Sequence, residues 1–139
     1  YAAALWAGRF ERKRPALTAI ALGTNASLAS LLGDIGEPTQ ALAKEVHALG
    51  APGDVLVAIA AGRANTVLIA ALQAALAKEM TVIALTGVDT GVIELMGETD
   101  VHIAVPHERA ARVFESHALV LHCLADAVDL QLMGEQDSA

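Results

Sequence analysis

The residues with the clearest potential for chemistry form a short turn between an apolar run at 55–60 and a helical run that begins near residue 65. In α/β proteins, a strand–turn–helix unit can hold a phosphate group through backbone N–H groups, hydroxyls and the positive end of the helix dipole. Residues 60–66, which we call the ligand loop, offer few such groups because several of their side chains are only methyl groups. The candidate ligand-binding residues are Ala60, Ala61, Gly62, Arg63, Asn65 and Thr66.

Two of these residues have a structural interpretation as well. Asn65 or Thr66 can cap the following helix by accepting a hydrogen bond from its first turn. Arg63 is either solvated or paired with a bound anion. The sequence therefore predicts a degenerate ligand loop.

Two histidines lie in the long apolar run near the carboxyl end. His117 and His122 are five positions apart, roughly 140° around a helix, so they cannot bind one metal ion together. A lone histidine on an apolar helix is typical of a packed, hydrogen-bonded residue. We therefore predict no metal site and no cofactor.

Composition limits the classes of function. The formal net charge of −7 excludes a basic face of the kind that binds nucleic acid non-specifically. The basic cluster at 9–15, "RFERKRP", is interpreted as a solvated turn, with an anion-binding patch as the alternative. No apolar run is long enough to span a membrane, and the single cysteine, Cys123, fits a small core residue in a reducing, cytoplasmic setting.

The pattern of apolar runs predicts an α/β fold with a parallel sheet. Near-continuous apolar strands that alternate with helices are typical of a sheet covered on both faces. Hydrophobic residues make up 55% of the chain but aromatic residues only 3%, so the core must be aliphatic. Strands are expected at 17–22, 55–60, 81–87 and 101–105, and helices at 2–10, 27–36, 38–50, 65–79, 92–97 and 108–133, with a frayed tail after 133.

Four segments together resemble the sugar isomerase (SIS) domain family. They are "GRFERKRPALTAIAL" at 8–22, "KEVHALGAPGDVLVAIA" at 44–60, "MTVIALTG" at 80–87 and "VFESHALVLHCLADAVD" at 113–129. The likeness is greatest to the phosphoheptose isomerase group and to the related DnaA initiator-associating (DiaA) group. It implies a Rossmann-like, three-layer αβα sandwich over residues 1–139. It also implies that this chain is the carboxyl-terminal part of a longer protein, whose amino-terminal helices and first strand precede Tyr1.

The resemblance also exposes two departures from the isomerase pattern. The serines that contact the sugar phosphate in the family fall on alanine, glycine and asparagine in this ligand loop. The catalytic and metal-binding His, Glu, Gln and His of the family correspond to Tyr1, Leu5, Phe114 and His122. Only His122 matches, and aldose–ketose isomerisation needs both a base and an acid. The isomerase site is therefore predicted to be dismantled.

These departures favour a non-catalytic, DiaA-like scaffold that binds the replication initiator DnaA and promotes initiator assembly at the chromosomal origin. A homo-oligomer, by the resemblance a tetramer, would bring several initiators together. The last helix is apolar nearly all round, which predicts cover by another subunit along Leu121, Leu124 and Val128. Leu132 and Met133 are the candidate contacts for DnaA, and a fraying terminus is the alternative interpretation of that tail.

Two alternatives remain. The chain could be a phosphoheptose (sedoheptulose 7-phosphate) isomerase with rearranged residues, or a sensor that binds a sugar phosphate weakly without turning it over. Leu5 and Phe114 oppose the isomerase, and the alanine-rich ligand loop opposes both alternatives.

Overall fold

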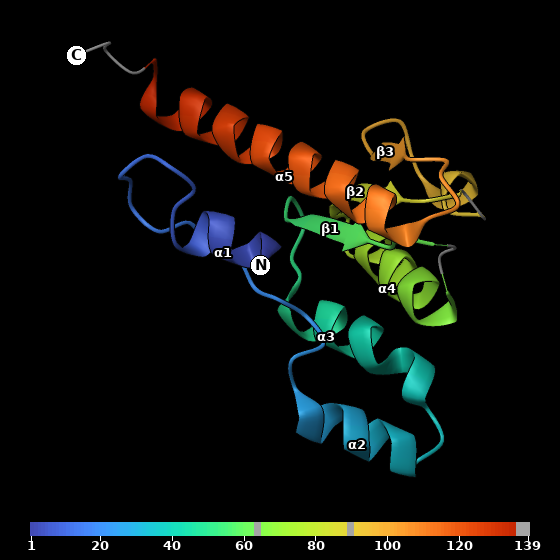
Figure 1. Ribbon diagram of the computed structural model, residues 1–139. Helices are drawn as coiled ribbons and strands as arrows, with labels where there is room; N and C mark the ends of the chain where they lie inside the picture. Colours follow the sequence, from blue (N-terminus) through green and yellow to red (C-terminus); the bar gives the residue numbers. More distant parts are fainter. Residues whose placement is uncertain (63–64, 89–90, 136–139) are drawn as a thin grey trace. The chain divides into compact units, whose positions relative to one another are not determined.

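The computed structural model describes residues 1–62, 65–88 and 91–135 (Figure 1). The chain forms two compact units. The sheet unit comprises Leu22–Phe114, and the terminal unit comprises Tyr1–Ala21 together with the chain from Glu115 onwards. The grouping of residues 1–139 into one domain stays a prediction.

The sheet unit is built on three parallel strands, β1 (Val55–Ile59), β2 (Thr81–Thr86) and β3 (Val101–Ala104), in the order β1-β2-β3. Ala58 pairs with Ala84, and Ile83 pairs with Val101, so β2 is the central strand. Val82, Ala84 and Leu85 of β2 are almost fully buried, as a strand covered on both faces requires. The predicted α/β fold with a parallel sheet is confirmed.

The prediction that the first of these strands is buried on both faces is wrong for β1. Val55 is 54% exposed and Ile59 is 36% exposed. Among the described residues only β2 pairs with β1, so β1 is an edge strand and part of its apolar surface is open. An apolar run alone cannot distinguish a central strand from an edge strand.

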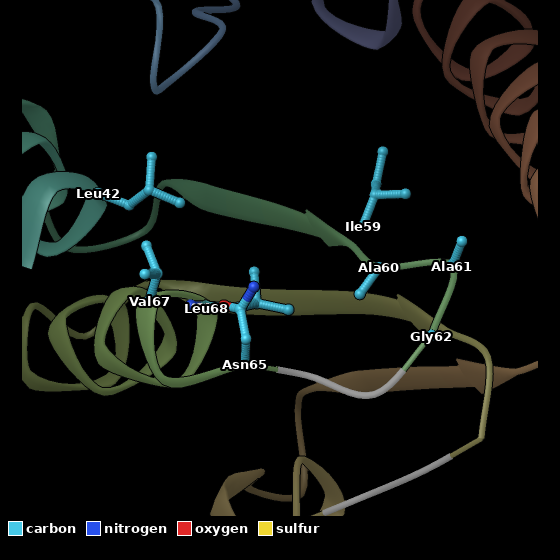
Figure 2. A pocket seen from close by; sticks show the side chains of 8 residues that line it. All are labelled: Leu42, Ile59, Ala60, Ala61, Gly62, Asn65, Val67 and Leu68. Carbon is cyan, nitrogen blue, oxygen red and sulfur yellow. Dashed lines mark hydrogen bonds between the residues drawn. The ribbon is translucent and has the colours of Figure 1, made fainter. Parts of the chain in front are cut away.

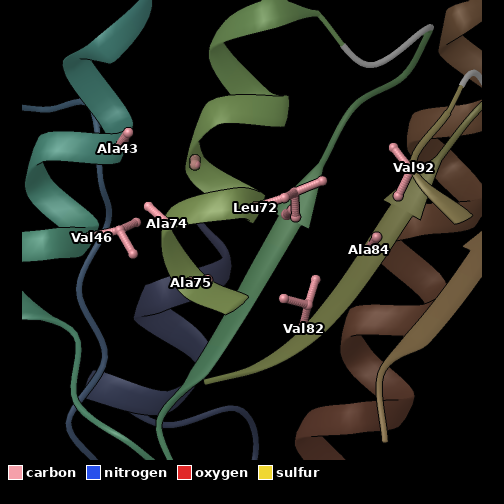
Figure 3. Packing of buried hydrophobic residues seen from close by; sticks show 10 residues of the cluster. Ala43, Val46, Leu72, Ala74, Ala75, Val82, Ala84 and Val92 are labelled. Carbon is pink, nitrogen blue, oxygen red and sulfur yellow. The ribbon is translucent and has the colours of Figure 1, made fainter. Parts of the chain in front are cut away.

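Helix α4 (Thr66–Ala77) packs on the sheet, α3 (Ala41–Leu49) packs on α4, and α2 (Ala26–Asp34) lies beyond α3 (Figure 1). Helix α4 is apolar nearly all round because it packs against the sheet on one side and against α3 on the other. Figure 3 shows this small-residue core. Its members are Ala43, Val46, Ala58, Ala71, Leu72, Ala74, Ala75, Val82, Ala84 and Val92. Two short 3-10 helices, η1 (Pro38–Gln40) and η2 (Ile93–Leu95), complete the unit.

The strand predicted at 17–22 is not formed. No described strand pairs with this segment, and the sheet ends at β1. A strand exists only where a neighbour satisfies its N–H and C=O groups. Leu17 N instead donates to the carbonyl oxygen of Trp6, over 3.1 Å.

Helix α1 (Ala2–Ala7) ends before Gly8, within the helix expected at 2–10, and Arg14 holds the basic turn that follows in place. The Arg14 side chain is only 1% exposed, and its Nε is ion-paired with Asp129 Oδ1. Its other nitrogens donate to the carbonyl oxygens of Leu5 and Trp6, over 2.6 and 2.8 Å, and to those of Gly8 and Pro15. The solvated-turn interpretation is therefore wrong for Arg14.

Helix α5 (Ala110–Met133) is longer than the other helices of the described chain. Leu121 is 5% exposed, and Leu124 and Val128 are half-buried. The subunit contact expected along this stripe stays a prediction. The exposed large apolar residues of α5 are Phe114, Leu119, Leu130, Leu132 and Met133. Cys123 is exposed rather than in the core. None of the described helices is long and apolar enough to cross a membrane.

Candidate functional site

The ligand loop leaves the carboxyl end of β1, where open α/β sheets bind their ligands. Ala60 N donates to the carbonyl oxygen of Leu85 over 2.9 Å, so the start of the loop is still held to β2. Ala61 and Gly62 then turn away from the sheet, and Asn65 directly precedes α4 (Figure 2). Arg63 lies outside the described residues, and Thr66 is the first residue of α4.

A cavity of about 450 Å³ lies beside the loop. Figure 2 shows Leu42 of α3 and Val67 of α4 at one end of the cavity, and Ile59 with the alanines of the loop at the other. Its lining is Leu42, Ile59, Ala60, Ala61, Gly62, Asn65, Val67 and Leu68. Asn65 has the only polar side chain in this lining. Among the described residues, the polar contacts to a ligand must therefore come mostly from backbone N–H groups.

Asn65 caps α4 as predicted. Its Oδ1 accepts a hydrogen bond from Leu68 N over 2.9 Å, and its backbone is extended (φ −97°, ψ 171°). Asparagine suits this position because its side chain satisfies an N–H group that the helix leaves open.

We expect the change Asn65→Ala to lower the free energy of unfolding by about 1 kcal/mol, because one N–H of the first turn of α4 loses its partner. Urea unfolding followed by circular dichroism measures this loss. The change Asn65→Asp keeps the capping oxygen and should retain the stability. Equal losses in the two variants would contradict the capping role.

The turn after β2 packs directly against the ligand loop. A Cβ added at Gly87 would overlap the carbonyl oxygen of Ala61 and would lie 3.4 Å from Gly62 Cα. Only glycine allows the two turns this close approach. The sequence interpretation missed Gly87, although its signal is visible: glycine directly follows the buried strand "TVIALT".

Thr86 and His102 were also missed. Thr86 ends β2 with 1% exposure, and its Oγ1 lies 2.8 Å from Nε2 of His102 on β3. The polar residue at the end of an apolar strand was a signal for Thr86. Its partner is sixteen positions away and becomes visible only once the strand register is known.

His122 lies in a small aromatic cluster in the terminal unit. Its Nε2 is 2.5 Å from the Tyr1 hydroxyl, and the Phe10 ring stacks on the imidazole with 4.9 Å between ring centroids. The Tyr1 ring meets the imidazole edge-on. His122 is therefore a packed histidine that is hydrogen-bonded to a phenol. His117, by contrast, is buried, with 1% exposure.

The remaining residues at the family's catalytic positions do not fit a metal ion. Leu5 is a buried hydrocarbon, with 5% exposure, and Phe114 is an exposed ring on α5. Neither side chain has a lone pair to donate, which metal coordination requires. Within residues 1–62, 65–88 and 91–135, no three His, Cys, Asp or Glu side chains come together as a possible metal site.

A parallel sheet with a cavity beyond the carboxyl end of a strand is the arrangement in which open α/β proteins bind their ligands. Comparison with known proteins makes this class more specific. The SIS domain family pattern matches residues 1–87, and a phosphoheptose isomerase from Methylibium petroleiphilum is 54% identical over 136 residues, covering 97% of this chain and 68% of that protein. This chain belongs to the SIS domain family.

Two further relatives agree. A phosphoheptose isomerase from Aromatoleum aromaticum is 48% identical over 130 residues, covering 93% of this chain and 66% of that protein. The structure of phosphoheptose isomerase from Neisseria gonorrhoeae superposes with a TM-score of 0.82 at 38% identity, covering 92% of this chain and 67% of that chain. The chain thus spans about two thirds of the length of these relatives.

The prediction of a DiaA-like scaffold that binds DnaA is wrong in the light of these relatives. Proteins 42–54% identical to this chain are named phosphoheptose isomerase, and so are its structural neighbours. The prediction gave too much weight to missing side chains and too little to the likeness of the whole chain. With it, Leu132 and Met133 lose their assignment as DnaA contacts.

Proposed function

We propose that this chain belongs to a phosphosugar isomerase of the phosphoheptose type, which binds its substrate at the ligand loop. The observation that carries the proposal is the 54% identity to a phosphoheptose isomerase across 97% of the chain. The cavity after β1 supports it, because α4 presents its amino-terminal end there and a helix amino terminus favours a phosphate.

The reaction needs few groups. A base removes a proton from the carbon next to the sugar carbonyl and returns it to the neighbouring carbon, while a hydroxyl proton moves between the two oxygens. Within the terminal unit, the imidazole of His122 is a group of the kind that can take and return such a proton. The Tyr1 hydroxyl, 2.5 Å from His122 Nε2, is the adjacent proton donor and acceptor. The fully aliphatic Leu5 gives no help, so turnover is expected to be slow.

A second candidate has its own support. Leu5 and Phe114 replace the polar groups that the isomerase pattern has at these positions, which favours a protein that binds a sugar phosphate without converting it. Such a sensor needs the ligand loop and the cavity but does not need His122 as a base.

The test is turnover and binding of sedoheptulose 7-phosphate. If the isomerase proposal holds, the protein produces the aldose phosphate, and His122→Ala abolishes this while His47→Ala, at an exposed histidine of α3, leaves it unchanged. A rise in melting temperature without turnover would favour the sensor, because a ligand that binds only the folded state stabilises it. If the protein shows no turnover and its melting temperature does not rise, both candidates are wrong.

A further inference from the structure

A series of contacts connects β3 to the ligand loop through the end of β2. His102 projects from β3 and is half-buried. Its Nε2 lies 2.8 Å from Oγ1 of Thr86, whose side chain is buried at the end of the central strand. A polar pair in a mostly aliphatic sheet is costly to bury unless its geometry is satisfied. This pair therefore fixes the rotamer of Thr86.

Thr86 is held at several further points. Its carbonyl oxygen accepts a hydrogen bond from Val105 N over 2.9 Å, and its hydroxyl lies 3.5 Å from the carbonyl oxygen of Gly87. The position of Thr86 thus sets where β2 ends and where Gly87 begins. Gly87 is buried directly against Ala61 and Gly62, with no space for even a methyl group. A shift of Thr86 must therefore move the backbone of the ligand loop.

From these contacts we propose that His102 is a positioning residue of the ligand site. It acts through Thr86 and Gly87 to hold the backbone of Ala61 and Gly62 in position. In that position, the N–H groups of these two residues can bind the phosphate of a phosphosugar. The inference rests on the proposed function for the identity of the ligand. The positioning of the loop itself does not depend on any ligand.

The test compares His102→Leu, which keeps the bulk but loses the nitrogen, with His102→Gln, whose amide can donate to or accept from Thr86 Oγ1 whichever tautomer His102 has. We expect His102→Leu to raise the Kd and the KM for sedoheptulose 7-phosphate about three- to tenfold with kcat unchanged, because uniform binding is lost. His102→Gln should stay within about twofold of the parent. His47→Leu, at an exposed histidine, is the matched control.

Hydrogen exchange of the ligand-free protein separates this inference from the proposed function. In His102→Leu, the amides of residues 60–62 should exchange faster, and in His102→Gln they should not. Faster exchange in a protein that binds no phosphosugar would support the positioning role and overturn the proposed function. Unchanged exchange at residues 60–62 in a folded His102→Leu variant would overturn the positioning role.

If His102→Leu does not fold, a double-mutant cycle with Thr86→Val and the less severe His102→Asn is the alternative. The quantity measured in the two single variants and the double variant is the hydrogen-exchange rate of the amides at residues 60–62. Coupled, non-additive effects are expected for two residues that act through one hydrogen bond. Additive effects would overturn the inference.

Discussion

Replacing Arg14 with methionine is expected to lower the free energy of unfolding by about 3–5 kcal/mol. Arg14 and Asp129 have side chains that are 1% and 2% exposed, and they join the turn after α1 to α5 within the terminal unit. Methionine fills much of the space of arginine, but it leaves the Asp129 carboxylate buried without its cation. It also removes the donors to the carbonyl oxygens of Leu5 and Trp6. Urea unfolding, with the midpoint and the slope fitted separately, measures the loss.

The exposed pair of Lys44 and Glu37 gives the matched control. Its atoms are 3.6 Å apart, and its side chains are 52% and 48% exposed. Solvent screens such a pair, so Lys44→Met should cost less than about 1 kcal/mol. The double change Arg14→Met with Asp129→Leu should recover part of the stability lost by Arg14→Met alone, because it removes the unpaired charge. A loss of under about 1 kcal/mol for Arg14→Met would show that the pair has no structural role.

The Arg14–Asp129 pair also shows what the sequence could not reveal. Arg14 stands in a run of charged residues, which is usually solvated, and Asp129 is 115 positions away, near the end of a long, mainly apolar helix. Periodicity predicts that a helix has a buried face but does not say which distant residue meets it.

Local patterns were more informative. The apolar runs at 55–60, 81–87 and 101–105 gave β1, β2 and β3 to within one residue at each end, because a buried parallel strand needs uninterrupted apolar side chains. The run at 17–22 is similarly apolar but forms no strand, because a strand is defined by hydrogen-bonded pairing with a neighbour, which composition does not encode.

The position of the ligand site stays a prediction, but the structure shows which residues the sequence could and could not assign around the ligand loop. Asn65 was identified as a helix cap from its place before an apolar helix, which is a local rule. Gly87, Thr86 and His102 act on the loop from other strands, so they required the sheet register. The function was misjudged for a related reason: the matching of individual catalytic positions outweighed a resemblance that covers nearly the whole chain.

Restoring hydroxyls to the ligand loop should strengthen phosphosugar binding more than any other small change. Ala60 and Ala61 line the cavity, and both are partly exposed to it. A hydrogen bond from a hydroxyl to a charged phosphate contributes about 1.5–3 kcal/mol. The double change Ala60→Ser with Ala61→Ser is therefore expected to lower the Kd for sedoheptulose 7-phosphate by about 10- to 100-fold, even if only one hydroxyl reaches the phosphate. Isothermal titration calorimetry measures this gain directly.

Ala77→Ser provides the control for the chemistry of the substitution. Ala77 is exposed at the far end of α4, about 16 Å of helix from Thr66 at a rise of 1.5 Å per residue. Its hydroxyl cannot reach the cavity, so its Kd should equal that of the parent. Binding of inorganic phosphate shows whether the new hydroxyls contact the phosphate group or the sugar. If they contact the phosphate group, the affinity for inorganic phosphate should rise together with that for the sugar phosphate. An unchanged Kd for both ligands in the double variant would mean that the phosphate does not bind at residues 60–62, and the binding site proposed here would have to be abandoned.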